Sequence, residues 1–278
     1  MEKPMYLKWI VEENGIIENF DKTLRCYNID YNNDNKVLDD WALHIRRHYI
    51  SDQELVSECD LFEVSPEEYL RTYIIPQKAD GLGPTARSNT ISEILFSDLL
   101  EYIFEYHVPR CRQYNMSGKT VSEHGTDIVG YKFAKEDKKP SKEDRLVAAE
   151  VKAILSQSDI SVINKAVTDS MKDEYRISLT LNYMRRKLRD MKKFDEEKEI
   201  LRFQLKTKAG YDYKIDYIAA GITSMPMLQK VKKGERELNI IPGIDGTSLA
   251  ISDDRSIFFV HGKKLMELAH EVYERCKK

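Results

Sequence analysis

Asp127, Glu150 and Lys152 are the residues of this sequence whose types and spacing best suit metal-assisted hydrolysis. Asp127 lies in the segment GTDIVGYK, and the other two lie in AAEVKAI. Side chains two residues apart on a strand project from the same face, so Glu150 and Lys152 are predicted to lie side by side. Two carboxylates, a carbonyl and water supply the oxygen ligands that Mg²⁺ prefers. A neighbouring lysine can hold the attacking water and stabilise the charge that develops on a phosphodiester.

The two segments that carry these residues are predicted to form a β-hairpin. Residues 123–135 and 144–156 have the apolar and β-branched content of strands, and the polar stretch EDKKPSKED between them must be a connection. In an antiparallel hairpin, the residue numbers of every facing pair add up to the same total. If Asp127 faces Glu150, this total places the turn inside that connection. Their Cβ atoms would then be roughly 4.5–5.5 Å apart. Facing carboxylates repel each other, which favours a cation between them.

A plain surface ion pair is the alternative interpretation of the Glu150 and Lys152 spacing. Such a pair on a solvent-facing strand contributes only about a few tenths of a kcal/mol. The residues that share the face of Glu150 on this strand, Leu146 and Ala148, are apolar. Their character argues against a strand that is half exposed to solvent.

The remaining elements predict an α/β fold in which helices flank a mixed sheet. An apolar stripe that includes Ile91, Leu95 and Leu99 predicts a buried helix within residues 89–107. The stretch KADGLGPTARSN predicts a boundary between an acidic N-terminal α+β region at 1–80 and a larger domain at 81–278. Further helices are predicted at 37–50, 65–76, 158–175, 177–194, 195–206 and 263–277, and further strands at 5–11, 23–29, 213–223 and 256–262.

The charges of the chain are distributed unevenly. The net charge is −3, but residues 1–75 hold 8 Lys and Arg against 16 Asp and Glu, whereas residues 76–278 hold 36 against 31. We interpret the acidic front as a surface for partner contact and the basic remainder as the side that meets a polyanion. An ordinary solvated acidic surface is the alternative. The split also predicts weak intrinsic affinity for DNA, with a partner supplying much of the binding.

A cluster of basic residues follows the predicted hairpin. Phosphate contacts need such charge, so this segment is a candidate DNA-binding helix. The acidic stretch DEEKE comes directly after it, so a solvated helix face with compensated charge is an equal alternative. The candidate residues are Arg176, Arg185, Arg186, Lys187, Arg189, Lys192 and Lys193.

The four cysteines lie far apart and include no CxxC pair, which predicts reduced, buried thiols and no zinc site. No apolar run approaches the length of a membrane span, and charged residues interrupt the first fifteen positions. These observations predict a cytoplasmic protein with no membrane association.

The segments GTDIVGYK and AAEVKAI resemble the D…ExK core of the PD-(D/E)xK nuclease superfamily. The wider arrangement is similar to the HamA family, the nuclease subunits of Hachiman anti-phage systems. The similar features are the chain length, the helix SEILFSDLLEYI, the segment HGTDIVGYKF, and LVAAEVKAIL followed by helices. Thr126 is a departure, because it stands where the general superfamily pattern has proline.

This resemblance implies a restriction-endonuclease-like core and a DNA nuclease that depends on Mg²⁺, with Mn²⁺ as an alternative ion. Carried over to this sequence, Asp127, Glu150 and Glu93 would hold the metal and Lys152 would assist the water. The resemblance also implies a partner, a superfamily 2 DNA helicase of the HamB type. The helicase would restrain the nuclease until invading or damaged DNA engages the complex.

Two other functions are open from the sequence. The first is a non-catalytic adaptor that binds DNA or a helicase and has a vestigial D…ExK; it predicts no Mg²⁺-dependent cleavage, even after release from a partner. The second is a stand-alone restriction endonuclease, which predicts sequence-specific cutting in the absence of an ATPase.

Overall fold

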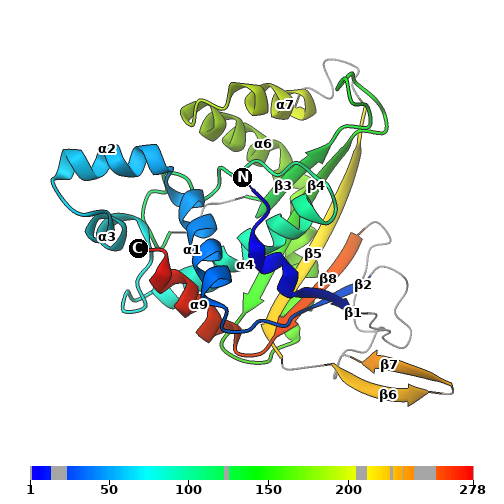
Figure 1. The fold of residues 1–278 in the computed structure, drawn as a ribbon. Coiled ribbons are helices and arrows are strands. Elements are labelled where there is room, and N and C mark those ends of the chain that lie inside the picture. The colour runs from blue at the N-terminus through cyan, green and yellow to red at the C-terminus, as the bar shows by residue number, and fades with distance from the viewer. Residues whose placement is uncertain are drawn as a thin grey trace.

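The fold is α/β, with a mixed sheet between two layers of helices, as predicted (Figure 1). The computed structural model describes residues 2–13, 24–121, 125–204, 212–225, 228–233, 235–240 and 255–277. Within these ranges a six-stranded sheet has the order β1-β2-β8-β5-β4-β3, and a separate two-stranded hairpin has the order β6-β7. The strands are β1 (Ile10–Glu13), β2 (Leu24–Ile29), β3 (Ile128–Lys132), β4 (Arg145–Ile154), β5 (Lys214–Ser224), β6 (Gln229–Lys233), β7 (Arg236–Ile240) and β8 (Arg255–Gly262).

Parallel pairs form the centre of the sheet and antiparallel pairs form its two edges. β4 pairs with β5, β5 with β8, and β8 with β2, all in parallel. β1 and β3 close the edges as antiparallel partners of β2 and β4. The helices are α1 (Asn35–Tyr49), α2 (Asp52–Phe62), α3 (Pro66–Tyr69), α4 (Gly83–Tyr102), α5 (Ser161–Ser170), α6 (Asp173–Asp190), α7 (Phe194–Gln204) and α9 (Leu265–Arg275), with a 3-10 turn η1 (Met5–Trp9) and a π-helical turn η2 (Leu70–Ile74).

The two faces of the sheet are covered by different helices. On β4, Val147, Ala149 and Val151 point into the core that α1, α4 and α9 share. Glu150 and Lys152 alternate with these residues and therefore project from the opposite face, where α5 and α6 contact β4. The predicted alternation along this strand is confirmed.

Gly221 allows α5 to approach the sheet next to Lys152. Gly221 is the partner of Lys152 in the β4–β5 ladder. A Cβ atom at this position would lie 2.8 Å from Val162 Cγ2 and 2.9 Å from Ile163 Cγ1, closer than real contacts allow. The glycine therefore fixes how near α5 lies to the polar end of β4.

The front of the chain joins the same sheet as the remainder. β1 and β2 precede the boundary predicted at residue 81, yet β2 pairs with β8 near the C-terminal end of the described chain. Trp41 and Ile45 of α1 lie in one hydrophobic core with Leu95 and Leu99 of α4. Residues 1–80 and 81–278 thus share a sheet and a core.

Local structure differs from the sequence predictions at several positions. The segment predicted as a strand at 5–11 is the turn η1 up to Trp9, and only then becomes β1. The helix predicted at 158–175 ends at Ser170, and α6 begins at Asp173. The prediction overlooked α2, although its capping box of Ser51 and Glu54 is visible in the sequence. It also overlooked β6 and β7.

All four cysteines are buried and unpaired, as predicted. In the part of the chain that the structure describes, no helix has the length and apolar character needed to cross a bilayer.

Candidate active site

The register of the β3–β4 hairpin confirms the predicted alignment. Ile128 pairs with Ala149, and the ladder continues without a bulge to Lys132 and Arg145. The residue numbers of every pair add up to the same total as those of Asp127 and Glu150, as predicted. Asp127 and Glu150 lie one position beyond the Ile128–Ala149 pair, so the hairpin brings both carboxylates to the same end of the sheet.

Lys152 is held between two carboxylates on the α5–α6 face of the sheet. Its Nζ lies 2.6 Å from Glu150 Oε1 and 2.9 Å from Asp169 Oδ2, on α5. Glu150 is almost completely buried, at 3% exposed, and its second oxygen, Oε2, accepts no hydrogen bond from the described residues. Arg176 Nη1 lies 4.0 Å from that oxygen.

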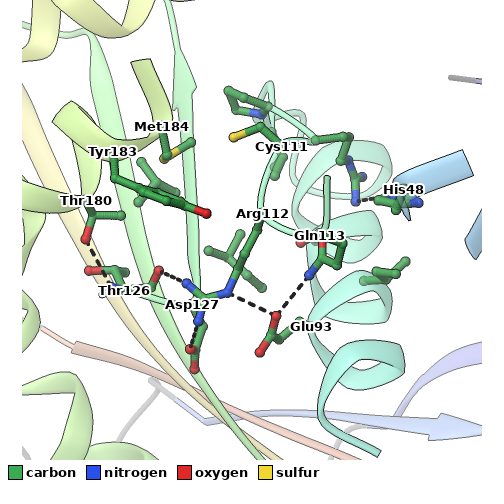
Figure 2. A pocket seen from close by; sticks show the side chains of 17 residues that line it. His48, Glu93, Cys111, Arg112, Gln113, Thr126, Asp127, Thr180, Tyr183 and Met184 are labelled. Carbon is green, nitrogen blue, oxygen red and sulfur yellow. Dashed lines mark hydrogen bonds and ion pairs between the residues drawn. The ribbon is translucent and has the colours of Figure 1, made fainter. Parts of the chain in front are cut away.

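Arg112 bridges Asp127 and Glu93, as Figure 2 shows. Its Nη2 donates to Asp127 Oδ1 at 3.0 Å, and its Nε lies 3.2 Å from Glu93 Oε2. Nη1 donates to the carbonyl of Thr126 at 2.9 Å. The backbone N–H of Val151 donates to Asp127 Oδ2 at 3.0 Å, so both oxygens of Asp127 are engaged.

Glu93 reaches the site from the opposite side of the sheet. It lies on α4, the helix that covers the face of Val147 and Ala149, whereas Glu150 projects from the other face. Gln113 Nε2 donates to Glu93 Oε2 at 3.0 Å, so the same oxygen contacts both Gln113 and Arg112.

Burial and mutual repulsion raise the pKa of three carboxyl groups. Burial, and then Asp127, raise the pKa of Glu150 to about 7. Burial also raises the pKa of Glu93 to about 7, with Asp127 and Glu150 acting against the charge of Arg112. The pKa of Asp173, on α6, is raised to about 6 by burial and by Asp127, although Thr126 donates a hydrogen bond to it. Burial opposes the charge of Lys152, but Glu150 and Asp169 raise its pKa above the usual value.

The donor chemistry of the site fits a hard divalent cation, although its geometry is not yet that of a complete site. Asp127 and Glu150 supply carboxylate oxygens, and Glu150 Oε2 is a buried oxygen that accepts no hydrogen bond from any described residue and that a cation would satisfy. Within the described ranges, no group of three or more His, Cys, Asp or Glu side chains is gathered closely enough to hold a metal ion. The guanidinium of Arg112 separates Glu93 from this pair.

The smaller of the two cavities beside Arg112 is too small for a substrate. It lies between α4, the segment around Cys111 and α6 (Figure 2), and its volume is about 30 Å³. A volume of this size holds roughly one or two water molecules. A second cavity of about 450 Å³ is lined by Glu93, Arg112 and Gln113. A polymeric substrate can therefore approach there or along the face where the side chains of Lys152 and Arg176 are 32% and 37% exposed.

Most of the predicted DNA-binding cations are engaged within the chain. Arg185 and Arg189 both pair with Glu197 of α7. Lys187 donates to the backbone carbonyls of residues 114 and 115 at 2.6 and 2.9 Å, and Lys193 pairs with Glu196. The compensation by the DEEKE segment, which the sequence left open, is therefore present.

Four residues of the site were not predicted from the sequence. Arg112 and Gln113 lie in an irregular segment between α4 and β3, where no periodic pattern marks them. Asp169 and Asp173 lie on either side of the break between α5 and α6, inside a stretch predicted to be one helix. The break itself was the missing signal, because it turns both carboxylates toward the sheet face that carries Glu150.

Comparison with known families gives one match. The model of the HamA family matches residues 4–276, which is nearly the whole chain. No curated protein matches the sequence.

Replacing Arg112 tests whether the site depends on its charge. R112M leaves Glu93 and Asp127 without their cation, so we expect the free energy of unfolding to fall by about 3–5 kcal/mol. R112K should recover part of the loss, because lysine supplies the charge but not the fork geometry. Urea unfolding measures both changes. The matched control is R47M, which breaks an exposed pair with Asp52 and should cost less than about 1 kcal/mol. Equal losses in R112M and R47M would contradict the assigned role.

The raised pKa of Glu150 predicts a specific pH dependence. A carboxyl whose pKa rises on folding contributes stability that is full below about pH 4.5 and is lost as the pH rises through about 7. The stability advantage of the wild-type chain over E150Q should therefore shrink between pH 5 and pH 8, by on the order of 1 kcal/mol. Urea unfolding at a series of pH values in EDTA measures this difference. A difference that is constant across the range would show that the pKa of Glu150 is not raised.

Proposed function

The chain belongs to the HamA family, which has its role in Hachiman anti-phage defence, and from this premise we propose that it is the metal-dependent DNA nuclease of such a system. The observation that carries the proposal is the confirmed hairpin register. It brings Asp127 and the Glu150–Lys152 pair together at one end of the sheet, in a largely buried setting where stability alone gives no reason to gather them.

The residues divide the work of phosphodiester hydrolysis. Asp127 and Glu150 would hold a Mg²⁺ ion, with Mn²⁺ as a substitute, and Glu93 is the further ligand that the sequence predicts. When bound, the ion supplies a Lewis acid for the phosphate oxygens and a water molecule of lowered pKa.

Lys152 acts as a fixed cation and not as a base. Its raised pKa keeps it protonated at neutral pH, and Glu150 and Asp169 orient its Nζ from two sides. A protonated, oriented amine can donate to the attacking water or to a phosphate oxygen and stabilise the negative charge of the transition state. We expect Arg176, which is 37% exposed and lies 4.0 Å from Glu150 Oε2, to contact the adjacent phosphate.

A partner is expected to supply much of the DNA affinity. Because Arg185, Arg189 and Lys193 are paired with glutamates of α7, fewer free cations remain for phosphate contacts. We propose that this partner is a helicase of the HamB type, which restrains the nuclease until DNA engages the complex.

The exposed arm of α2 and α3 supports a protein contact. Figure 1 shows both helices standing away from the sheet. Along α2 only Cys59 is buried, while Val56, Leu61 and Phe62 are exposed. Apolar side chains in solvent among acidic residues are typical of interaction surfaces. The acidic residues of the arm are Asp52, Glu54, Glu58, Asp60, Glu63, Glu67 and Glu68.

Cleavage by the purified chain, with and without its helicase, tests the nuclease activity. We expect Mg²⁺-dependent cutting of plasmid DNA that EDTA abolishes. E150Q and K152M should each lower the rate by at least about 100-fold, because each removes a charge that the transition state needs. K264M is the matched control, since Lys264 forms an ordinary exposed pair with Glu267 and should leave the rate unchanged.

The same assay separates the alternatives. Cutting that persists in an E150Q/K152M double variant would refute the assigned site. Discrete bands from the isolated chain would favour a restriction endonuclease. A complete lack of cleavage, with the helicase and DNA both present, would favour the adaptor.

Two equally exposed leucines test the partner surface. Leu61 on α2 and Leu179 on α6 are both 74% exposed, so truncating either should not unfold the chain. We expect L61A to weaken helicase binding by about tenfold, equivalent to about 1.4 kcal/mol, and L179A to leave it unchanged. Titration calorimetry with the purified helicase measures both affinities. The arm is not the contact surface if L61A binds as tightly as wild type.

A further inference from the structure

The carboxylates of the candidate site fall into two groups that differ in how well they are satisfied. Glu93 and Asp127 form the first group around Arg112. Glu150 and Asp173 form the second, on the face of the sheet that α5 and α6 cover. The two groups meet just before β3 begins, at the neighbouring residues Thr126 and Asp127.

The Glu93 group already has a cation within the chain. Arg112 lies between Glu93 and Asp127 at 3.2 and 3.0 Å, and Gln113 adds a hydrogen bond to Glu93 at 3.0 Å. The side chains of Glu93 and Asp127 are both 13% exposed, so their charges face a guanidinium in place of bulk water. A metal ion at Glu93 or at Asp127 would compete with this arginine, and at Glu93 it would also compete with Gln113.

The second group contains two buried oxygens that accept no hydrogen bond in the described part of the chain. These oxygens are Glu150 Oε2 and Asp173 Oδ2. Glu150 is 3% exposed and Asp173 is fully buried. Buried carboxylate oxygens without a donor are costly, and they are uncommon outside functional sites.

The elements of the fold hold Asp173 next to the other carboxylates. Its second oxygen, Oδ1, accepts a hydrogen bond of 2.9 Å from Thr126 Oγ1, one residue before Asp127. Thr180, two turns further along the same face of α6, accepts a hydrogen bond of 3.1 Å from the N–H of Thr126, so α6 is tied to the residues before β3 at two points. Asp173 is therefore fixed to the same strand end that presents Asp127.

The nearby arginines do not satisfy these oxygens. Arg176 Nη1 is 4.0 Å from Glu150 Oε2, beyond hydrogen-bond distance. Arg255 offsets only part of the rise that burial causes in the pKa of Asp173, and its own ion pair is with Glu174. Among the residues that the structure describes, the two oxygens thus have no hydrogen-bond donor.

We propose that Asp173, and not Glu93, is the third carboxylate ligand of the metal, completing a site with Asp127 and Glu150. This inference rests on the proposed function. The ligand oxygens are not yet gathered at coordination distance, so binding requires these side chains to move together, and the cation would offset their repulsion. Arg112 keeps its place as the counter-ion of Glu93.

Mn²⁺ binding distinguishes the two candidate ligands without relying on activity. Free Mn²⁺ is titrated by electron paramagnetic resonance against the full chain and against D173N, E93Q and E150Q. Both amide variants at 173 and 93 preserve shape and remove one charge, so they are matched. We expect D173N to weaken Mn²⁺ binding by at least tenfold and E93Q to change it by less than twofold. Urea unfolding confirms that each variant is folded.

The remaining outcomes each overturn the proposal. If D173N binds Mn²⁺ like wild type while E150Q does not, Asp173 is no ligand, yet the proposed nuclease site stands. Equal losses of Mn²⁺ affinity in D173N and E93Q would mean that the ion does not bind Asp173 in preference to Glu93. If the wild-type chain binds no Mn²⁺, both this inference and the metal-dependent function fail.

A second measurement uses the wild-type chain, in case D173N does not fold. Fe²⁺ with ascorbate and peroxide cuts a polypeptide next to the bound ion, and the fragments are identified by mass spectrometry. We expect cuts near residues 127, 150 and 173, and none near 93. Cuts near 93 without cuts near 173 would overturn the proposal.

Discussion

Carboxylates from α4, α6 and the β3–β4 hairpin converge in a region from which water is largely excluded, and each disfavours the ionised form of the next. Such a cluster persists only if the surrounding structure holds its members in place. The ladder between β3 and β4 fixes Asp127 and Glu150, and the guanidinium of Arg112 compensates one side of the cluster. The arrangement of helices on the two faces then decides which carboxylates lie near one another.

The hairpin was predictable because it depends on local rules. The alternation along β4 and the register with β3 follow from strand periodicity and from a turn fixed by the polar connection. The type of α4 likewise follows from its apolar stripe. The role of Arg112 could not be predicted from the sequence. It lies in an irregular segment, and its two partners are 19 and 15 residues away in sequence. Asp173 was concealed because a uniform helical pattern hides the break before it.

Long-range pairing was also beyond local rules. The sequence predicted a strand at 23–29, and the structure confirms it, but its parallel pairing with β8 joins residues more than 230 positions apart. The uneven charge was visible in the composition, whereas the pairing of Arg185 and Arg189 with Glu197 depends on how α7 folds back on α6. Composition therefore indicated where charge is concentrated, and packing decides how much of it is available.

The order of strands in the sheet also governs when the site can assemble during synthesis. β4 carries Glu150 and Lys152, yet its parallel neighbour β5 is translated some sixty residues later, and β8, which joins β5 to β2, later still. A nascent chain that ends before β8 has the hairpin but lacks the strand that unites the two halves of the sheet. Translation must therefore be nearly complete before the sheet can close, so a prematurely terminated chain lacks the framework that positions the carboxylates of the candidate site.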